Sequence, residues 1–162
     1  MTLETIGVGG GCHWCTEAVF TALRGVQTVQ QGFINSVPPH DGFSEAVIVV
    51  FDPDTIPLKV IIDIHLRTHA ATSNHSMREK YRSAIYTYSD EQSENVDQIL
   101  TELQSNFDKK IITQTLPFGA FKLSDEKYQN YGAKNSDGQF CKTYIDPKLS
   151  MLRVKYSKLV KS

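Results

Sequence analysis

The stretch "GVGGGCHWCTEAVF", Gly7 to Phe20, joins a predicted strand over residues 3–10 to a predicted helix over residues 12–25. Its glycines allow the backbone to approach other groups closely, and the apolar residues that follow recur at helical spacing. Gly25 is typical of a residue that ends a helix. The sequence therefore predicts a strand, a glycine turn and a helix with Cys12 in its first turn.

Outward from this stretch, predicted strands and helices alternate along the chain. Ser89 and Gln92 have the spacing of a capping box, and Val96, Ile99, Leu100, Leu103 and Phe107 recur at core-facing positions of the helix that follows. Strands are predicted over 26–34, 44–51, 82–88 and 110–116, helices over 57–69, 89–107 and 125–131, a loop over 35–42, and an irregular tail that closes as an amphipathic helix. This order predicts an α+β fold, with a mixed sheet, helices packed mostly on one face and a ferredoxin-like βαββαβ core.

Composition excludes several classes of protein. The chain has 162 residues, 40% of them hydrophobic, and a formal net charge of −1, which predicts a single domain over 1–162 without a basic surface for nucleic acid. No apolar run is long enough to span a membrane, and no Sec-type signal precedes the glycines. Three cysteines in such a chain indicate catalytic or metal-binding thiols in a reducing, cytoplasmic compartment.

Cys12 is the strongest candidate for chemistry. The thiolate is the nucleophilic form of cysteine, and the N-terminal end of a helix stabilises negative charge. The alternative is a small buried hydrophobic residue, which is the common role of a free cysteine. Cys15, three residues on, gives the Cys-X-X-Cys spacing of redox pairs. Zinc would need more ligands than two thiols with His13 or His40, and we count neither a second Cys-X-X-Cys nor a close histidine pair.

Several stretches resemble the A-type peptide methionine sulfoxide reductases. "GGGCHWCTEAVF" is similar to the "GCFW" signature of that family, "GFSEAVIVVFDP" to its "GHAEAV…DP", and "KYRSAIY" to its "QYRSAIY". "FKLSDEKYQNY" and "FCKTYIDPKL" resemble later family segments. The resemblance covers nearly the whole chain and implies reduction of the S-epimer of methionine sulfoxide, without a cofactor.

The resemblance also implies roles for individual residues. Cys12 is the nucleophile that attacks the sulfoxide sulfur, and Glu45 is the acid that protonates the departing oxygen. That role needs a carboxyl held partly neutral by burial, whereas a solvent-facing carboxylate is the alternative. Tyr81 binds the sulfoxide oxygen. Trp14 forms the aromatic wall for the S-methyl group, although without the resemblance it would be a core residue.

A second thiol then condenses with the Cys12 sulfenic acid, and a dithiol such as thioredoxin reduces the disulfide. Cys15 is adjacent, but regular helical spacing is wider than a disulfide requires. Cys141, in "NSDGQFCKTY", resembles the recycling cysteine of the family. We favour Cys141, and a relay through both thiols stays open.

The chain departs from the family pattern at three places. His13 replaces a phenylalanine, giving "GCHWC" in place of "GCFWG", and it either lines the methyl pocket or is a neutral packing substitution. The loop between Phe33 and Phe43 is shortened and lacks a second tyrosine. Ser76 or His75 stands where the family has an acidic residue. These departures bear on substrate affinity and identity.

Two hypotheses follow. The first is a monomeric reductase of free or peptide-bound methionine sulfoxide, with thioredoxin or another dithiol as partner and with no nucleic acid or membrane partner. The second is a non-catalytic Cys-X-X-Cys module that binds a metal or senses oxidants.

Overall fold

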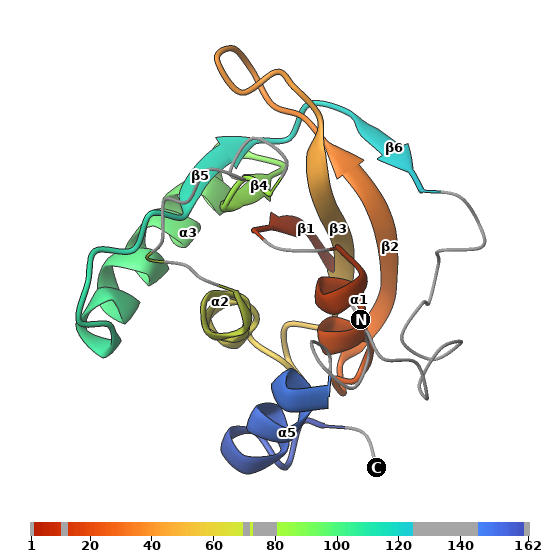
Figure 1. Cartoon of the computed structure of the whole chain (residues 1–162), viewed down its shortest axis with the longest axis vertical. Coiled ribbons are helices and arrows are strands. Elements are labelled where there is room, and N and C mark those ends of the chain that lie inside the picture. The colour runs from red at the N-terminus through yellow and green to blue at the C-terminus, as the bar shows by residue number, and fades with distance from the viewer. Residues whose placement is uncertain (1, 11–12, 70–71, 73–80, 125–145, 161–162) are drawn as a thin grey trace.

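The computed structural model describes residues 2–10, 13–69, 72, 81–124 and 146–160, without the side chains of His13, Trp14 and Asp146. Strands and helices alternate along the chain (Figure 1). The strands are β1 Glu4–Gly9, β2 Val26–Ile34, β3 Ser44–Phe51, β4 Ala84–Thr87, β5 Gln114–Pro117 and β6 Phe121–Leu123. The helices are α1 His13–Thr21, α2 Leu58–Thr68, α3 Asp90–Leu103, the 3-10 turn η1 Gln104–Asn106 and α5 Asp146–Lys155.

The strands form one mixed sheet in the order β5-β4-β1-β3-β2-β6. The β4–β5 pair is parallel, and the other neighbouring pairs are antiparallel. The inner order β4-β1-β3-β2, reached through β1-α1-β2-β3-α2-β4, is the ferredoxin-like arrangement. The predicted fold class is therefore confirmed, and the single domain stays a prediction.

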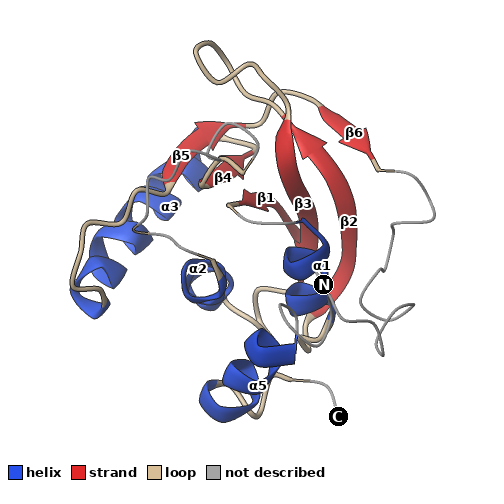
Figure 2. Ribbon diagram, viewed as in Figure 1, coloured by secondary structure: helices blue, strands red, loops and turns tan. Residues whose placement is uncertain are grey.

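The main core lies between the sheet and its helices (Figure 2). Because side chains alternate across a strand, Ile6 and Val8 of β1 face the helices together with Val47 and Val49 of β3. These four side chains are completely buried. Phe20 of α1, Ile61 of α2, Val96 of α3 and Leu152 of α5 belong to the same cluster.

A smaller apolar cluster lies on the opposite face of the sheet, where hydrogen bonds of Arg82 connect three strands. Ala46, Ile48 and Ala84 pack there beside Tyr86. Arg82 reaches three strands, because its backbone N–H donates to Ser44 Oγ (2.8 Å), its Nη2 to the Ile34 carbonyl (3.1 Å) and its Nε to the Tyr86 hydroxyl (3.1 Å). Burial raises the pKa of Tyr86, and the Arg82 guanidinium opposes that shift.

Strands 26–34 and 44–51 lie where they were predicted, but α1 ends at Thr21, before Gly25. The helix ends early because the next residues pair with the C-terminal segment: Leu23 forms a β-bridge with Val160, and the Arg24 N–H donates to the Leu159 carbonyl (2.6 Å). Gly25 then adopts a φ of 88°. Tertiary pairing overrides the local stop signal.

The predicted capping box of α3 is half confirmed. Ser89 Oγ accepts from the Gln92 N–H (3.1 Å), but Gln92 Oε1 accepts from the Tyr88 N–H (2.8 Å) and not from Ser89. Val96 and Leu103 are buried as expected. The other predicted core positions, Ile99, Leu100 and Phe107, are partly buried against the same cluster.

Two predicted elements differ at their ends. The strand predicted over 110–116 is β5 at Gln114–Pro117, because the Ile111 N–H donates to the side chain of Gln104 (2.9 Å) and not to a neighbouring strand. Pro57 precedes α2 as its N-cap and does not lie in its first turn. The helix predicted over 125–131 lies outside the described residues. In the part of the chain that the structure describes, no helix is long and apolar enough to cross a membrane.

Candidate active site

Three strands bring the candidate catalytic segments to one edge of the sheet. Gly9, the last residue of β1, is paired with Ala46 on one side and with Ala84 on the other. Both neighbours run antiparallel to β1, so β1 ends at the edge where β3 and β4 begin. Three parts of the chain therefore meet at this edge: the segment that leads to Cys12, the residue Glu45, and the segment between Tyr81 and the start of β4.

Glu45 is a buried carboxyl group on the helix-covered face of the sheet. Only 6% of the residue is exposed. It precedes Ala46, whose side chain lies in the opposite-face cluster, so alternation places Glu45 on the side of the main core. Its neighbour across the strand pair is Phe33 of β2. This burial fits a shielded acid and is contrary to the alternative of a solvent-facing carboxylate.

Tyr81 reaches the same edge from the other side. It is half-buried, and the following residue, Arg82, donates its N–H to Ser44 Oγ beside Glu45 (2.8 Å). This bond ties the approach of β4 to the start of β3. The sheet thus brings Tyr81 and Glu45 together, although they are far apart in the sequence.

Helix α1 begins at His13, directly after Cys12 in the sequence. Cys12, Ser76 and Cys141 lie outside the described residues, and so do the side chains of His13 and Trp14. Cys15 is on α1 with 5% of its surface exposed. The roles predicted for these residues stay predictions.

The last turn of α2 is fastened to the same edge by two histidines that the sequence reasoning overlooked. His65 is 2% exposed, and its Nε2 donates to the Gly9 carbonyl (2.7 Å). His69 Nδ1 donates to the His65 carbonyl, and its Nε2 accepts from the Ser83 hydroxyl (2.8 Å). Ser83 in turn contacts Thr113 Oγ1 (2.8 Å). The imidazoles therefore connect α2 to β1 and to the approach of β4.

The statement that the chain lacks a close histidine pair was wrong. His65 lies in the last turn of α2 and His69, four residues on, is the C-cap residue of that helix; their ring centroids are 4.2 Å apart. Their spacing was the available signal. Both rings form hydrogen bonds within the protein, to Gly9, Ser83 and the His65 carbonyl, and these bonds fasten the end of the helix. Among the described residues, no group of three or more His, Cys, Asp or Glu side chains could hold a metal ion.

His69 also packs against Gly10, the first residue after β1. A Cβ atom at Gly10 would lie 2.4 Å from His69 Cδ2, and Gly10 has a φ of 152°. Both observations require glycine here, because a side chain would be strained and would collide with the imidazole. The close contact with His69 at the end of α2 therefore requires glycine at position 10, two residues before Cys12.

A chain of buried polar residues holds α1 over the sheet, and no pattern in the sequence predicted it. Gln31 of β2 is 0% exposed and donates through Nε2 to Glu17 Oε1 of α1 (2.8 Å). Its Oε1 accepts from the Ser124 hydroxyl (2.9 Å). Glu17 and Ser124 are buried too, so this chain links the helix that follows Cys12 to the segment after β6.

Comparisons with known proteins agree with this architecture. A model of the family described as peptide methionine sulfoxide reductase matches residues 4–159. The peptide methionine sulfoxide reductase MsrA of Pasteurella multocida is 33% identical over 175 residues, which cover 99% of this chain and 100% of the relative. Mxr1 from Saccharomyces cerevisiae in its reduced form has a TM-score of 0.75 and 26% identity, over 88% of this chain and 91% of that one. Mxr1 in a complex with Trx2 has a TM-score of 0.62 and 24% identity, over 80% and 84%.

The fold thus matches that of a class of enzymes, the oxidoreductases that act through a thiol. The chain belongs to the peptide methionine sulfoxide reductase family. Family membership favours the reductase over the alternative, a non-catalytic module that binds a metal or senses oxidants.

Proposed function

We propose that the protein reduces the S-epimer of methionine sulfoxide, in peptides or proteins, to methionine and is recycled by thioredoxin or a similar dithiol. The observation that carries the assignment of the site is the burial of Glu45 at the sheet edge toward which β1 leads the chain. A carboxyl group in this position is shielded from bulk water and faces the same side of the sheet as the helix that follows Cys12.

In the proposed first step, the Cys12 thiolate attacks the sulfoxide sulfur and Glu45 supplies a proton to the oxygen. The oxygen moves to Cys12, which becomes a sulfenic acid, and methionine leaves in its reduced form. The Tyr81 hydroxyl donates a hydrogen bond to the sulfoxide oxygen. Its half-buried position at the same edge supports this role.

Trp14 and His13 are proposed to line the pocket for the S-methyl group, with Ser76 at its margin. An aromatic ring offers apolar area and a favourable contact to sulfur. His13 and Trp14 open α1, so they directly follow the nucleophile in the sequence. This arrangement would select a substrate by its methyl group on one side and by its oxygen on the other.

The second half of the proposed cycle forms a disulfide and releases water. A partner thiol attacks the Cys12 sulfenic acid, and a dithiol then reduces the product. Cys15 is 5% exposed, and a disulfide at such a buried position is poorly accessible to an external reductant. This burial supports Cys141 as the recycling residue. We also propose that the protein is a monomer and that it meets thioredoxin in solution. The crystallised complex of yeast Mxr1 with Trx2 is a precedent for such an encounter.

The test uses the purified protein, dithiothreitol and each epimer of a blocked methionine sulfoxide. We expect turnover of the S-epimer alone, none in Cys12→Ser, and intact single-turnover reduction in Cys15→Ser and Cys141→Ser. Glu45→Gln should lower kcat by about 10²- to 10⁴-fold, whereas the exposed carboxylate variant Glu102→Gln should retain it. Stoichiometric zinc without turnover would instead support the metal-binding module.

A further inference from the structure

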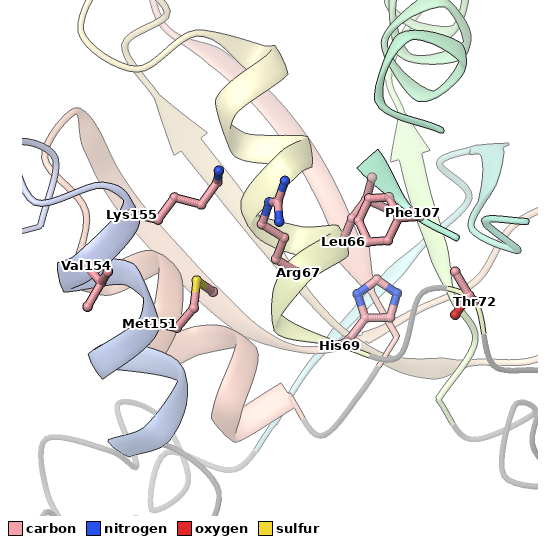
Figure 3. Close-up of a pocket in the computed structure, with 8 residues that line it drawn as sticks. All are labelled: Leu66, Arg67, His69, Thr72, Phe107, Met151, Val154 and Lys155. Atoms are coloured by element: carbon pink, nitrogen blue, oxygen red, sulfur yellow. The ribbon is translucent and has the colours of Figure 1, made fainter. Parts of the chain in front are cut away.

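A pocket of about 550 Å³ lies between α2 and α5, outside the residues assigned to the reaction. Figure 3 shows its walls, which come from the end of α2, from α5, and from Phe107 in the segment that follows α3. It combines apolar and cationic side chains. Its described lining includes Arg67, His69, Phe107, Met151, Val154 and Lys155.

Two cations are directed to the same end of this pocket. The Arg67 guanidinium and the Lys155 ammonium extend from facing helices toward one another (Figure 3). Like charges on facing helices repel unless an anion lies between them. A third cation is close by, because Lys148 Nζ donates to the Thr68 carbonyl at the end of α2.

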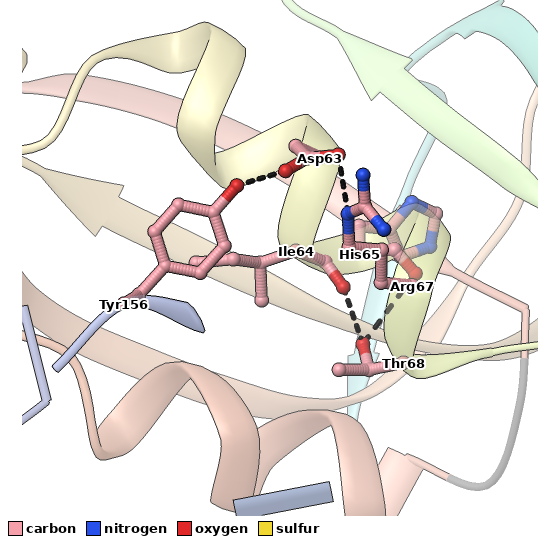
Figure 4. A network of polar contacts seen from close by, with 6 residues as sticks. All are labelled: Asp63, Ile64, His65, Arg67, Thr68 and Tyr156. Atoms are coloured by element: carbon pink, nitrogen blue, oxygen red, sulfur yellow. Dashed lines mark hydrogen bonds and ion pairs between the residues drawn. The ribbon is translucent and has the colours of Figure 1, made fainter. Parts of the chain in front are cut away.

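Asp63 holds Arg67 in this position through an ion pair. Its Oδ1 accepts from Arg67 Nε (2.9 Å), and its other oxygen accepts from the Tyr156 hydroxyl of the segment that follows α5 (Figure 4). The Arg67 guanidinium also lies over the Phe107 ring, 5.7 Å from its centroid. Asp63 balances one of these charges, and among the described residues that line the pocket Arg67 and Lys155 are cationic and none is a carboxylate, so this part of the pocket keeps a positive excess.

The pocket adjoins the catalytic edge through His69. This imidazole lines the pocket, and it also packs against Gly10, two residues before Cys12. The apolar side of the pocket includes Val154, which is 86% exposed although it is a large hydrophobic residue. An exposed apolar side chain beside cations suits a polypeptide with both apolar and acidic residues.

We propose that this pocket binds an acidic side chain that neighbours the methionine sulfoxide in a polypeptide substrate. The inference rests on the proposed function and names the class of substrate.

The experiment compares three blocked peptides that carry the S-sulfoxide and differ only in flanking residues, which are Glu, Gln or Lys. Dithiothreitol serves as the reductant, so that docking of a protein reductant does not contribute. We expect kcat/KM for the Glu peptide to exceed that for the Gln peptide about threefold and that for the Lys peptide about tenfold, which corresponds to a few solvent-accessible charge pairs. Salt at 0.5 M should reduce the preference, because these charges are screened.

Lys155→Glu tests the pocket, and Lys158→Glu is the matched control. Both lysines are exposed in the C-terminal segment and both changes alter the net charge equally, but Lys158 is not among the described residues that line the pocket. Lys155→Glu should abolish or invert the ratio between the Glu and Lys peptides, and Lys158→Glu should leave the ratio as in the wild type. Lys155→Gln, with a smaller effect in the same direction, checks that the outcome does not come from misfolding.

Equal reduction of the three peptides would overturn the inference and leave the proposed function intact. An equal effect of Lys155→Glu and Lys158→Glu would also overturn it, because it would mean that only the overall charge matters. Failure to reduce any S-sulfoxide peptide would refute the proposed function itself.

Discussion

Replacing Gly10 by alanine perturbs the contact between the glycine run and α2. The backbone at Gly10 has a φ of 152°, and a Cβ atom would lie 2.4 Å from His69 Cδ2 and 2.7 Å from its Nε2. Backbone strain of this kind costs about 1–3 kcal/mol, and overpacking adds about 1–3 kcal/mol. We therefore expect Gly10→Ala to lower the free energy of unfolding by about 2–6 kcal/mol, out of the ~5–15 kcal/mol typical of a domain.

Urea denaturation followed by circular dichroism measures this loss. With a slope of about 2 kcal/mol/M, the midpoint should fall by about 1–3 M. Gly42→Ala is the matched control, because nothing lies within 4 Å of its added Cβ atom. That variant should stay within about 0.5 kcal/mol of the wild type.

A double-mutant cycle separates the collision from the backbone strain. His69→Ala alone loses the bonds to Ser83 and to the His65 carbonyl, at a cost of about 1–3 kcal/mol. In the Gly10→Ala background the same change also removes the collision, so the two changes should be less destabilising together than their sum by about 1–3 kcal/mol. If Gly10→Ala unfolds at the same urea concentration as Gly42→Ala, the packing of His69 against Gly10 has been misjudged.

Two further predictions concern buried polar groups. Burial raises the pKa of Tyr86 and raises that of Tyr88 to about 12, so both phenols ionise first in the unfolded chain. The free energy of unfolding should therefore be constant below about pH 10 and should fall as the pH rises through the folded pKa values. Tyr86→Phe should flatten this decline in denaturation curves recorded from pH 8 to 12. A decline as steep in Tyr86→Phe as in the wild type would contradict this. Glu17→Ala should lower the free energy of unfolding by about 1–3 kcal/mol, because the buried Gln31 amide loses the carboxylate of Glu17 as its acceptor. Glu17→Gln should cost less, because its amide oxygen can still accept. Equal urea midpoints for the two variants would show that this hydrogen bond contributes nothing to stability.

Local patterns predicted the elements of the sheet well. The strands over 26–34 and 44–51 were found at the predicted residues, because β-branched and aromatic residues there are bounded by clear loop signals. The burial of Glu45 is compatible with the acid role that the family resemblance implied, and that role stays a prediction.

Contacts between distant segments were beyond the reach of such patterns. Periodicity tells which face of a helix is apolar, but it does not tell which residue elsewhere in the chain will meet it. The early end of α1 depends on pairing between Leu23 and Val160, and the link from Glu17 to Gln31 depends on how α1 lies over β2. The pair His65 and His69 was visible as spacing, but its bonds to Gly9 and Ser83 required the fold.

The attachment of α5 has a consequence for protein engineering. Tyr156 and Lys148 hold this helix to α2 by contacts to Asp63 and to the Thr68 carbonyl, whereas the sheet edge with Glu45 is built from other segments. The outward residues of α5 can therefore be randomised as a cassette while these two anchors are kept. If the pocket between α2 and α5 binds the flanking residues of the substrate as proposed, such a library should change which peptides are preferred and leave the chemical step unchanged.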